Sequence, residues 1–420
     1  MTKASAPGQR PRGRRGRLVA ALCASVLGAS ACISSASGGG NASATSFAEL
    51  DPIVLRVPTL YGPGHYQTRA LEEYGAAVEK ASDGKVSFEF FYLDSLVEPA
   101  DTTKALADGI VDVSLVVPGY TPSDFPIDVW TSDLAFQSSS RPVVGALQST
   151  AAVLDWSFNQ PEMLAEYDRL GLVPLLPRFT GHVSYNLLCT KPVTSLREAR
   201  GMRGRVGGPN WAKEIEALGM TSVSLAGGEI YEGFQRGIID CYVGSGPDMV
   251  ATGLWDVGKH YTELGLSGWS SGGLMVGKTT WERLPLIVRQ VLFDQSTVYL
   301  ESWHRGWIEG MREFVVQGQK RGVQFHEPDE SMRGALEKFH QRVLGTAQRR
   351  APEGVSAPGE FLDAYSAAHD RWLGIVTGEL GYEPRGTTWA EWARGGDTEI
   401  DLGPWIERIR ERILAPHRPQ

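Results

Sequence analysis

The sequence predicts an α/β protein made of two successive α/β units. Segments typical of strands and helices alternate from residue 53 onward, and a second series begins near residue 184. Hydrophobic residues make up 42% and charged residues 21% of the 420 residues, which is ordinary for a chain with a globular core. This length allows two or three domains.

In the first unit, short apolar or alternating runs are followed by stretches of helical periodicity. Strands are expected at residues 53–58, 86–92 and 111–117. Helices are expected at residues 65–81, 100–109, 141–158 and 161–171. This order of elements predicts a largely parallel sheet.

The second unit has shorter elements and then several long helices. Strands are expected at residues 184–190, 204–207, 222–225, 238–243, 274–276 and 323–326. Helices are expected at residues 211–218, 229–236, 248–258, 285–319, 329–349 and 360–380. The segment 285–319 is amphipathic and has no internal proline, so one long helix is expected there.

Residues 1–31 have the pattern of a signal peptide. A basic region ends at Arg17, and the apolar run 18–28 that follows is too short to span a bilayer. Because these residues carry a charge of +6 and the whole chain carries −8, the remainder carries −14. An acidic body argues against a nucleic-acid partner. The pair Arg14-Arg15 resembles a twin-arginine export signal, and a basic region of the general secretory route is the alternative.

Small residues precede a cysteine at the end of this segment. Ala29-Ser30-Ala31-Cys32 resembles a lipobox, in which Cys32 becomes the lipid-modified first residue of the mature chain. Residues 32–50 would then form a flexible tether. The expected location is the periplasm or the outer face of the cell membrane, with the protein anchored through Cys32. Ordinary signal cleavage near Ala31 is the alternative.

Two further cysteines remain in the mature body, Cys189 and Cys241. In an oxidising compartment such a pair is a disulfide candidate, and two buried, reduced cysteines are the alternative. No CxxC or Cys/His spacing indicates a metal site.

Two short motifs point to enzymes and are weak in their context. Residues 272–279 fit the phosphate-binding pattern GxxxxGK[ST], but the middle of the motif is apolar and typical of a strand. Residues 268–272 fit GxSxG with Ser270 as the nucleophile, but a strand follows where the nucleophile elbow needs a helix. A turn between two strands explains both stretches better.

A longer series of matches resembles one transport family. Residues 191–206 are KPVTSLREARGMRGRV, and residues 228–240 are GEIYEGFQRGIID. Residues 281–285 (WERLP) and 108–112 (DGIVD) add two shorter matches. In this order they resemble the solute receptors of tripartite ATP-independent periplasmic (TRAP) transporters, the C4-dicarboxylate-binding-protein family. The resemblance covers about residues 53 to 380.

The resemblance implies a two-lobe fold like that of periplasmic binding proteins, with hinge strands and a long helix shared by both lobes. The first lobe would comprise residues 51–182 and 266–318, and the second residues 183–265 and 319–382. Residues 383–420 would be a C-terminal extension. The extension carries three tryptophans and is expected to pack on the body, with partner binding as the alternative. The implied fold also places Cys189 and Cys241 in one sheet region, with an expected Cα separation near 5–6 Å.

The resemblance implies that Arg205 binds the ligand carboxylate from the second lobe. A guanidinium meets a carboxylate with two parallel hydrogen bonds, which a lysine cannot copy. Pairing of Arg205 with Glu214 or Glu229 is the alternative. Many family members have another arginine just before the Lys191-Pro192 element, and this sequence has none between residues 180 and 186.

Other ligand contacts are expected around Arg205, each with a structural alternative. His182 or Tyr185 would replace the missing arginine or serve as a hinge or core residue. Ser245 stands near the place of a family asparagine, and Cys241 replaces a glycine. Four residues follow expected strands, where α/β sheets place their ligand loops, or could instead pack in the core: Tyr61, Tyr120, Asn210 and Trp211.

Together these features predict a binding protein that captures a small organic carboxylate and delivers it to the membrane subunits of a TRAP-type transporter. No catalytic residues, cofactor or metal are expected. The missing arginine and the aromatic candidates weaken the assignment of a C4-dicarboxylate and allow a larger or aromatic acid. The alternatives are an exported serine hydrolase using Ser270 and a binding protein of an ABC transporter.

Overall fold

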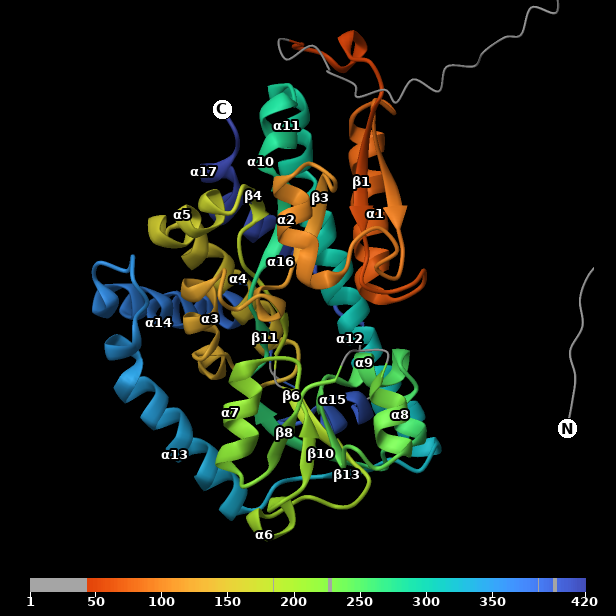
Figure 1. The fold of residues 1–420 in the computed structure, drawn as a ribbon, viewed down its shortest axis with the longest axis vertical. Helices are drawn as coiled ribbons and strands as arrows, with labels where there is room; N and C mark the ends of the chain where they lie inside the picture. Colours follow the sequence, from red (N-terminus) through yellow and green to blue (C-terminus); the bar gives the residue numbers. More distant parts are fainter. Residues whose placement is uncertain (1–43, 184, 226–228, 384, 396–398) are drawn as a thin grey trace, which may run out of the picture. The chain divides into compact units, whose positions relative to one another are not determined.

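The computed structural model describes residues 44–183, 185–225, 229–383, 385–395 and 399–420. Within them the chain forms two lobes, each with its own sheets and flanking helices (Figure 1). The expected signal peptide and Cys32 lie outside the described residues. In the described part of the chain, no helix combines the length and apolar character that a membrane crossing needs.

The first lobe contains three small sheets. β1 (Ile53–Pro58) pairs with β2 (Val86–Phe91), and β5 (Thr180–His182) pairs with β11 (Trp269–Ser270). The third sheet has the order β3-β12-β4, formed by Val113–Val116, Gly273–Gly277 and Leu172–Leu176. The helices are α1 (Tyr66–Ala81), α2 (Thr102–Ala107), α3 (Pro126–Ser132), α4 (Val144–Phe158) and α5 (Pro161–Arg169).

The prediction of a largely parallel sheet is wrong for this lobe. Only β1 and β2 are parallel, whereas β12 is antiparallel to both β3 and β4. β12 returns from much later in the chain and is buried along its whole length. The hydrophobic pattern of a strand reports its burial and not its direction, so the sequence could not show this pairing.

The second lobe contains one mixed sheet with the strand order β13-β10-β6-β9-β7-β8. β7 is parallel to β8 and β9, β10 is parallel to β13, and β6 is antiparallel to β9 and β10. The strands are β6 (Tyr185–Cys189), β7 (Arg203–Arg205), β8 (Thr221–Val223), β9 (Cys241–Gly244), β10 (His260–Leu266) and β13 (Gln324–His326). The helices are α6 (Leu196–Ala199), α7 (Pro209–Ala217), α8 (Ile230–Gln235) and α9 (Gly246–Ala251).

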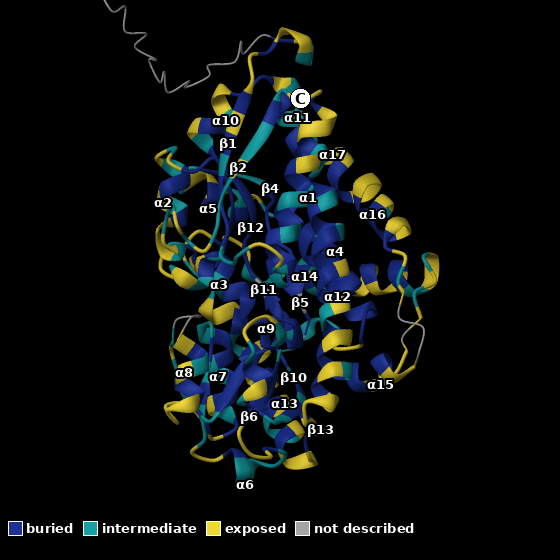
Figure 2. Ribbon diagram, turned by 90° about the vertical axis from the view of Figure 1, so that its right-hand side faces the viewer, coloured by how far each residue is buried: buried dark blue, intermediate teal, exposed yellow. Residues whose placement is uncertain are grey.

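Four strands were not predicted from the sequence: β4, β5, β10 and the two-residue β11. Pro174, Gly181 and Gly265 interrupt the apolar alternation in the first three, and both residue types weaken a strand pattern. Tertiary pairing forms these strands nonetheless, and most residues of β10 and β6 are buried (Figure 2).

The segment 285–319 forms two helices instead of one. After α10 (Lys278–Arg283), α11 (Leu286–Asp294) ends and α12 (Ser296–Lys320) begins beside Gln295. The hydroxyls of Ser296 and Thr297 donate to the carbonyls of Phe293 and Asp294. Such side-chain bonds compete with backbone bonding and favour a break at this point.

Helix α12 contacts both lobes, as expected for the shared helix. It packs against α1 of the first lobe and α9 of the second. A Cβ atom on Gly306 would lie 2.8 Å from the Cβ of Tyr66, and one on Gly310 would lie 2.8 Å from the Cβ of Pro247. These two glycines, about one helical turn apart, therefore let both lobes approach the same helix closely.

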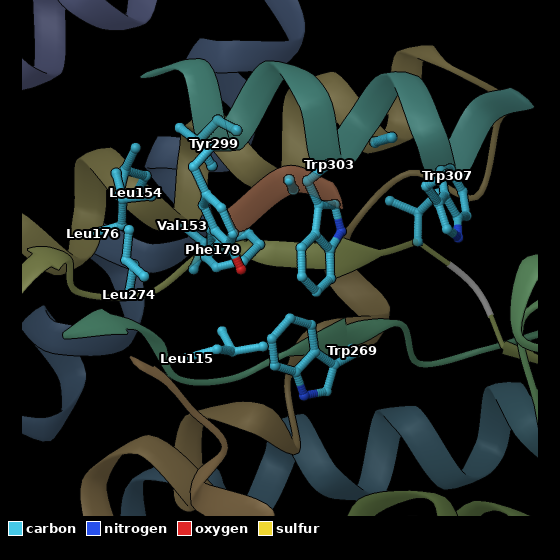
Figure 3. Close-up of a cluster of buried hydrophobic side chains, with 14 of the residues drawn as sticks. Leu115, Val153, Leu154, Leu176, Phe179, Trp269, Leu274, Tyr299, Trp303 and Trp307 are labelled. Atoms are coloured by element: carbon cyan, nitrogen blue, oxygen red, sulfur yellow. The ribbon is translucent and has the colours of Figure 1, made fainter. Parts of the chain in front are cut away.

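One face of α12 anchors the strands that pass between the lobes. Tyr299, Trp303 and Trp307 recur every four residues and so lie on one side of the helix (Figure 3). The Trp303 ring stacks on Trp269 of β11 with centroids 5.8 Å apart, and its Nε1 donates to the carbonyl oxygen of Gly181 in β5 at 2.9 Å. The hinge region is therefore tied to the helix by both apolar contact and a hydrogen bond.

The C-terminal extension packs on the body, as predicted. The indole Nε1 of Trp405 donates to the carbonyl oxygen of Leu147 in α4 at 3.1 Å, and the Trp389 ring meets Trp307 of α12 edge-on at 4.9 Å. The Glu263 carboxylate of β10 accepts two backbone N–H groups at the start of α15. The last helices of the chain are α13 (Glu330–Ala347), α14 (Pro358–Gly374), α15 (Trp389–Arg394), α16 (Gly403–Ile409) and α17 (Ala415–His417).

Cys189 and Cys241 form the expected disulfide. They are opposite each other in the antiparallel pair β6–β9, and their Cα atoms are 4.1 Å apart. This distance is shorter than the expected 5–6 Å because directly opposed residues of antiparallel strands approach to about 4.5 Å. The bridge closes a loop that contains Arg205 and Trp211.

Replacing both cysteines by alanine should lower the free energy of unfolding. The bridge spans a sequence separation of 52 residues, and closing a loop of that size contributes up to roughly 4 kcal/mol in the chain-entropy model. Chemical unfolding with and without dithiothreitol measures the effect. The double variant should be insensitive to dithiothreitol while the wild type loses stability, and two free thiols in the unfolded, unreduced protein would contradict the bridge.

Candidate ligand-binding site

Loops from both lobes meet beside Arg205. In the first lobe, Tyr61 follows β1 and Tyr120 lies in the loop after β3. In the second lobe the contributing loops follow β7 and β9. A Cβ atom on Gly119 would lie 3.8 Å from the carbonyl oxygen of Gly207, so the loops after β3 and β7 are within van der Waals range across the two lobes.

Arg205 is the last residue of β7 and is half-buried. Its Nε and Nη2 donate to the carbonyl oxygen of Leu225 at 3.2 and 3.1 Å, and its guanidinium lies 5.7 Å from the centre of the Tyr242 ring. Among the described residues, no carboxylate lies within 4.0 Å of this guanidinium. Glu214, an alternative partner, instead accepts from the Ser267 hydroxyl and lies 2.8 Å from the His340 ring nitrogen.

The contacts of Arg205 leave one end of its guanidinium for a ligand. A guanidinium has five N–H donors, and Leu225 uses one from Nε and one from Nη2. The remaining donors, on Nη1 and Nη2, have the fork geometry that meets both oxygens of a carboxylate. A Cβ atom on Gly207 would lie 3.3 Å from Nη1, so the glycine keeps this end uncrowded.

Four tyrosines lie within electrostatic range of the guanidinium, and the Tyr242 ring is 5.7 Å from it. The set consists of Tyr61, Tyr120, Tyr185 and Tyr242. Desolvation raises the pKa of all four hydroxyls, although Tyr120 as a whole is 46% exposed. The Asp248 carboxylate raises the pKa further, and the Arg205 guanidinium lowers it. Because both charges act on all four rings, the tyrosines, Arg205 and Asp248 form one cluster. At neutral pH the hydroxyls are protonated and can donate or accept hydrogen bonds.

Asp248 lies at the start of α9 and is only 7% exposed. Its carboxylate accepts from the hydroxyl of Ser245 at 2.8 Å and from that of Tyr66 at 3.3 Å. Tyr66 belongs to α1, so the second bond joins the two lobes. Burial raises the pKa of Asp248, whereas His65, Ser245, Tyr66 and Arg205 lower it.

Trp211 and Asn210 begin α7, directly after the Arg205 strand. Trp211 is 6% exposed, its Nε1 donates to the carbonyl oxygen of Ser267 at 2.7 Å, and its ring stacks on Tyr185 at 4.7 Å. Asn210 is 7% exposed. Trp211 therefore holds Tyr185 in place, which is the packing alternative for this residue.

The remaining expected residues lie in different environments. Ser245 is buried and bonded to Asp248, so it acts on the site through that carboxylate. His182 is in β5, and its side chain lies outside the described residues. The nearby Arg178 is fully buried and donates to the Asp128 carbonyl oxygen at 3.1 Å, so it belongs to the core and does not replace the missing arginine.

Asp248, Tyr66 and Tyr242 belong to the candidate site, and the sequence analysis missed them. Asp248 follows the end of β9, a position where ligand loops are expected, and this was the available signal. Tyr242 lies two residues before Gly244, where a Cβ atom would lie 2.3 Å from the tyrosine ring. Tyr66 is on a helix of the other lobe, and nothing in the local sequence shows that it reaches Asp248.

The structure also argues against an enzymatic role for the two short motifs. The middle of the phosphate-loop match is the buried central strand β12, and Lys278 pairs with Asp168 at 2.5 Å on the surface. Ser270 lies in β11, and β12 follows it where a nucleophile elbow needs a helix. The described residues contain no group of three or more His, Cys, Asp or Glu side chains that would suit a metal ion.

The fold and the site define a solute-binding protein: two α/β lobes share a long helix, and polar and aromatic side chains from both lobes gather at their junction. The chain belongs to the family of bacterial extracellular solute-binding proteins, family 7, whose sequence profile matches residues 59–349. Proteins of this family and the similar solved structures are transport-associated binding proteins, not enzymes.

Three relatives illustrate the similarity. A solute-binding protein of Albidiferax ferrireducens is 24% identical over 235 residues, which are 54% of this chain and 65% of that protein. An extracytoplasmic solute receptor of Bordetella pertussis that binds pyroglutamic acid has a TM-score of 0.63 at 17% identity and covers 74% of this chain and 99% of its own. A TRAP periplasmic solute-binding protein of Chromohalobacter salexigens with bound D-glucuronate has a TM-score of 0.60 at 20% identity, covering 74% and 99% of the two chains.

Proposed function

We propose that this protein captures a small organic acid outside the cell membrane and delivers it to the membrane subunits of a TRAP-type transporter. Arg205 binds the carboxylate of the ligand, and tyrosines from both lobes enclose the rest. The main support for this proposal is the geometry of Arg205. Its backbone contact fixes the guanidinium, and its free end has no acidic partner among the described residues.

Other observations support this role. The similar structures are described as binding pyroglutamic acid and D-glucuronate, which are both small organic acids. The family membership favours a TRAP transporter over the ABC alternative. Tyr61, Tyr120 and Tyr185 remain in the proposed ligand-contacting set, and Asn210, Trp211, Ser245 and His182 are proposed contacts or supports at its edge.

Mass spectrometry of compounds that co-purify with the protein tests this function. Denaturing the purified protein should release a small acid in near-stoichiometric amount, and calorimetry should then show that the ligand-free protein rebinds this acid. A released ligand without a carboxylate, or turnover of the acid into products, would contradict the proposal.

We propose that ligand capture closes the two lobes by a hinge motion. The first lobe comprises residues 51–182 and 266–318, and the second comprises residues 183–265 and 319–382. Helix α14 is an exception within the last range, because it packs on α4 and therefore moves with the first lobe. Asp133 of the first lobe pairs with Lys213 of α7 at 2.8 Å, a contact that an opening motion would break. Small-angle scattering should show a smaller radius of gyration after the acid is added, and an unchanged radius would contradict closure.

We also propose that Cys32 carries a lipid anchor. The support is the local sequence Ala29-Ser30-Ala31-Cys32 after a signal-like segment. Metabolic labelling with a radioactive fatty acid should tag the wild type and not the Cys32→Ser variant. Equal labelling of the two proteins would rule the anchor out.

A further inference from the structure

The proposed function leaves open what the ligand carries besides its carboxylate, and the charges around Arg205 bear on this question. Arg205 is the one cation of the cluster, and Asp248 is its one carboxylate. Asp248 is buried on the loop after β9, next to the Arg205 strand β7, and it raises the pKa of all four tyrosines. A dianionic ligand would therefore bring its second negative charge close to a buried acid.

Asp248 is a buried residue at the junction between the two lobes. It is only 7% exposed, and its two oxygens accept from hydroxyls of different lobes, Ser245 at 2.8 Å and Tyr66 at 3.3 Å. An ionised carboxylate offers about four acceptor positions, so these two bonds leave room for more donors. A buried carboxylate is costly unless donors surround it, and a donor on the ligand would reduce this cost.

The position of Asp248 complements that of Arg205. Arg205 ends β7 and Asp248 follows β9, and these two strands lie side by side and parallel in the sheet. Arg205 lies close enough to lower the pKa of Asp248, yet no ion pair joins them in the described part of the chain. The aromatic ring of Tyr242, the second residue of β9, packs under the guanidinium. The cluster thus presents a cation and an anion to the same space.

We propose that the ligand carries one carboxylate, which binds Arg205, and a hydrogen-bond donor that binds Asp248, and that Asp248 selects against dicarboxylates. The donor is an ammonium, an amide N–H or a hydroxyl group. This inference rests on the proposed function, because it needs the carboxylate to bind at Arg205. It adds a specificity-determining residue and narrows the class of acid.

Calorimetry with matched acids tests the proposal on the purified protein after co-purified ligand is removed by unfolding and refolding with the disulfide intact. In the five-membered-ring set, proline and pyroglutamate carry a donor and cyclopentanecarboxylate does not. In the six-membered-ring set, D-glucuronate carries hydroxyls and cyclohexanecarboxylate does not. Succinate and glutarate supply a second carboxylate instead of a donor.

In the wild type, the donor-bearing acids of at least one ring size should bind tenfold or more tightly than the donor-free ring and the dicarboxylates. In Asp248→Asn this preference should shrink to less than threefold. Asp256→Asn is the matched control, because Asp256 lies on the same lobe and pairs with Arg321 at the surface, and it should keep the wild-type ranking. Tyr66→Phe separates selectivity from lobe closure, because losing the bond between the lobes should weaken all acids by a similar factor.

Two results would overturn the inference alone: a dicarboxylate or a donor-free ring that binds as tightly as the donor-bearing acids, or an unchanged ranking in Asp248→Asn. In either case, loss of binding in Arg205→Ala would show that the proposed function still holds and that only the role of Asp248 is wrong. If no acid of the panel shows binding that depends on Arg205, the proposed function fails, and the inference fails with it.

Discussion

Arg205→Lys is expected to weaken binding of the ligand carboxylate by tenfold or more, and Arg205→Ala by about a hundredfold or more. A charge-assisted hydrogen bond contributes roughly 1.5–3 kcal/mol, and each 1.4 kcal/mol is a factor of ten in affinity. Lysine keeps the charge but loses the fork that meets both oxygens. Alanine also leaves the charge of the ligand without a partner in a partly buried site. Calorimetry with the co-purified acid measures both effects.

A control separates loss of binding from loss of fold. Arg205 is half-buried and its described polar contacts are to the Leu225 carbonyl oxygen, so the unfolding temperature without ligand should change little. Arg197→Lys, an exposed arginine on α6 of the same lobe, should leave affinity unchanged. Unchanged affinity in both Arg205 variants would remove this residue from the site.

Trp405→Ala is expected to cost about 3–5 kcal/mol in the free energy of unfolding, the range for a buried Trp or Phe truncated to alanine. The Trp405 side chain is fully buried, its Nε1 donates to the Leu147 carbonyl oxygen at 3.1 Å, and its ring lies 4.9 Å from that of His304 in α12. The substitution leaves a cavity between the C-terminal extension, α4 and α12. Chemical unfolding followed by circular dichroism measures the change.

The matched control for this prediction is Glu411→Ala in the same extension. The Glu411 side chain is 60% exposed and lies 3.6 Å from Arg408, so its removal should change stability by no more than about 0.5 kcal/mol. A loss below 1 kcal/mol in Trp405→Ala would show that the extension contributes little to the stability of the body, and partner binding would then become the better explanation of its tryptophans.

Local sequence patterns predicted most elements, and an ordered motif singled out Arg205 as the candidate carboxylate-binding residue. The strands β1 and β2 and the helices α1, α5 and α13 form close to their expected positions, because their apolar periodicity matches the face that they bury. The strands β3, β9 and β12 and the helix α4 also form close to their expected positions, as apolar runs that are buried along nearly their whole length. The structure places Arg205 at the end of β7, where the loops after β3 and β7 approach each other. The disulfide followed from two cysteines and an oxidising compartment, and the register of β6 and β9 brings them together.

Sequence periodicity did not predict how segments that are distant along the chain pair and pack. The antiparallel insertion of β12 between β3 and β4 joins segments from very different parts of the chain. Helix α14 packs on α4, although its place in the sequence had assigned it to the other lobe. Periodicity along a segment records which face is buried and carries no information on the neighbour that buries it.

The sequence by itself determined the class of protein, the two-lobe α/β architecture and the pairing of Cys189 with Cys241, and it singled out Arg205 as the candidate for carboxylate binding. Only the tertiary structure decided that Tyr66 of one lobe bonds Asp248 of the other, and that Gly306 and Gly310 of α12 seat the two lobes on one helix. The physical reason is the range of the interactions. Motifs and periodicities act within one element, whereas a binding site between lobes is formed by side chains far apart in sequence, and their contacts exist only once both lobes pack on the shared helix.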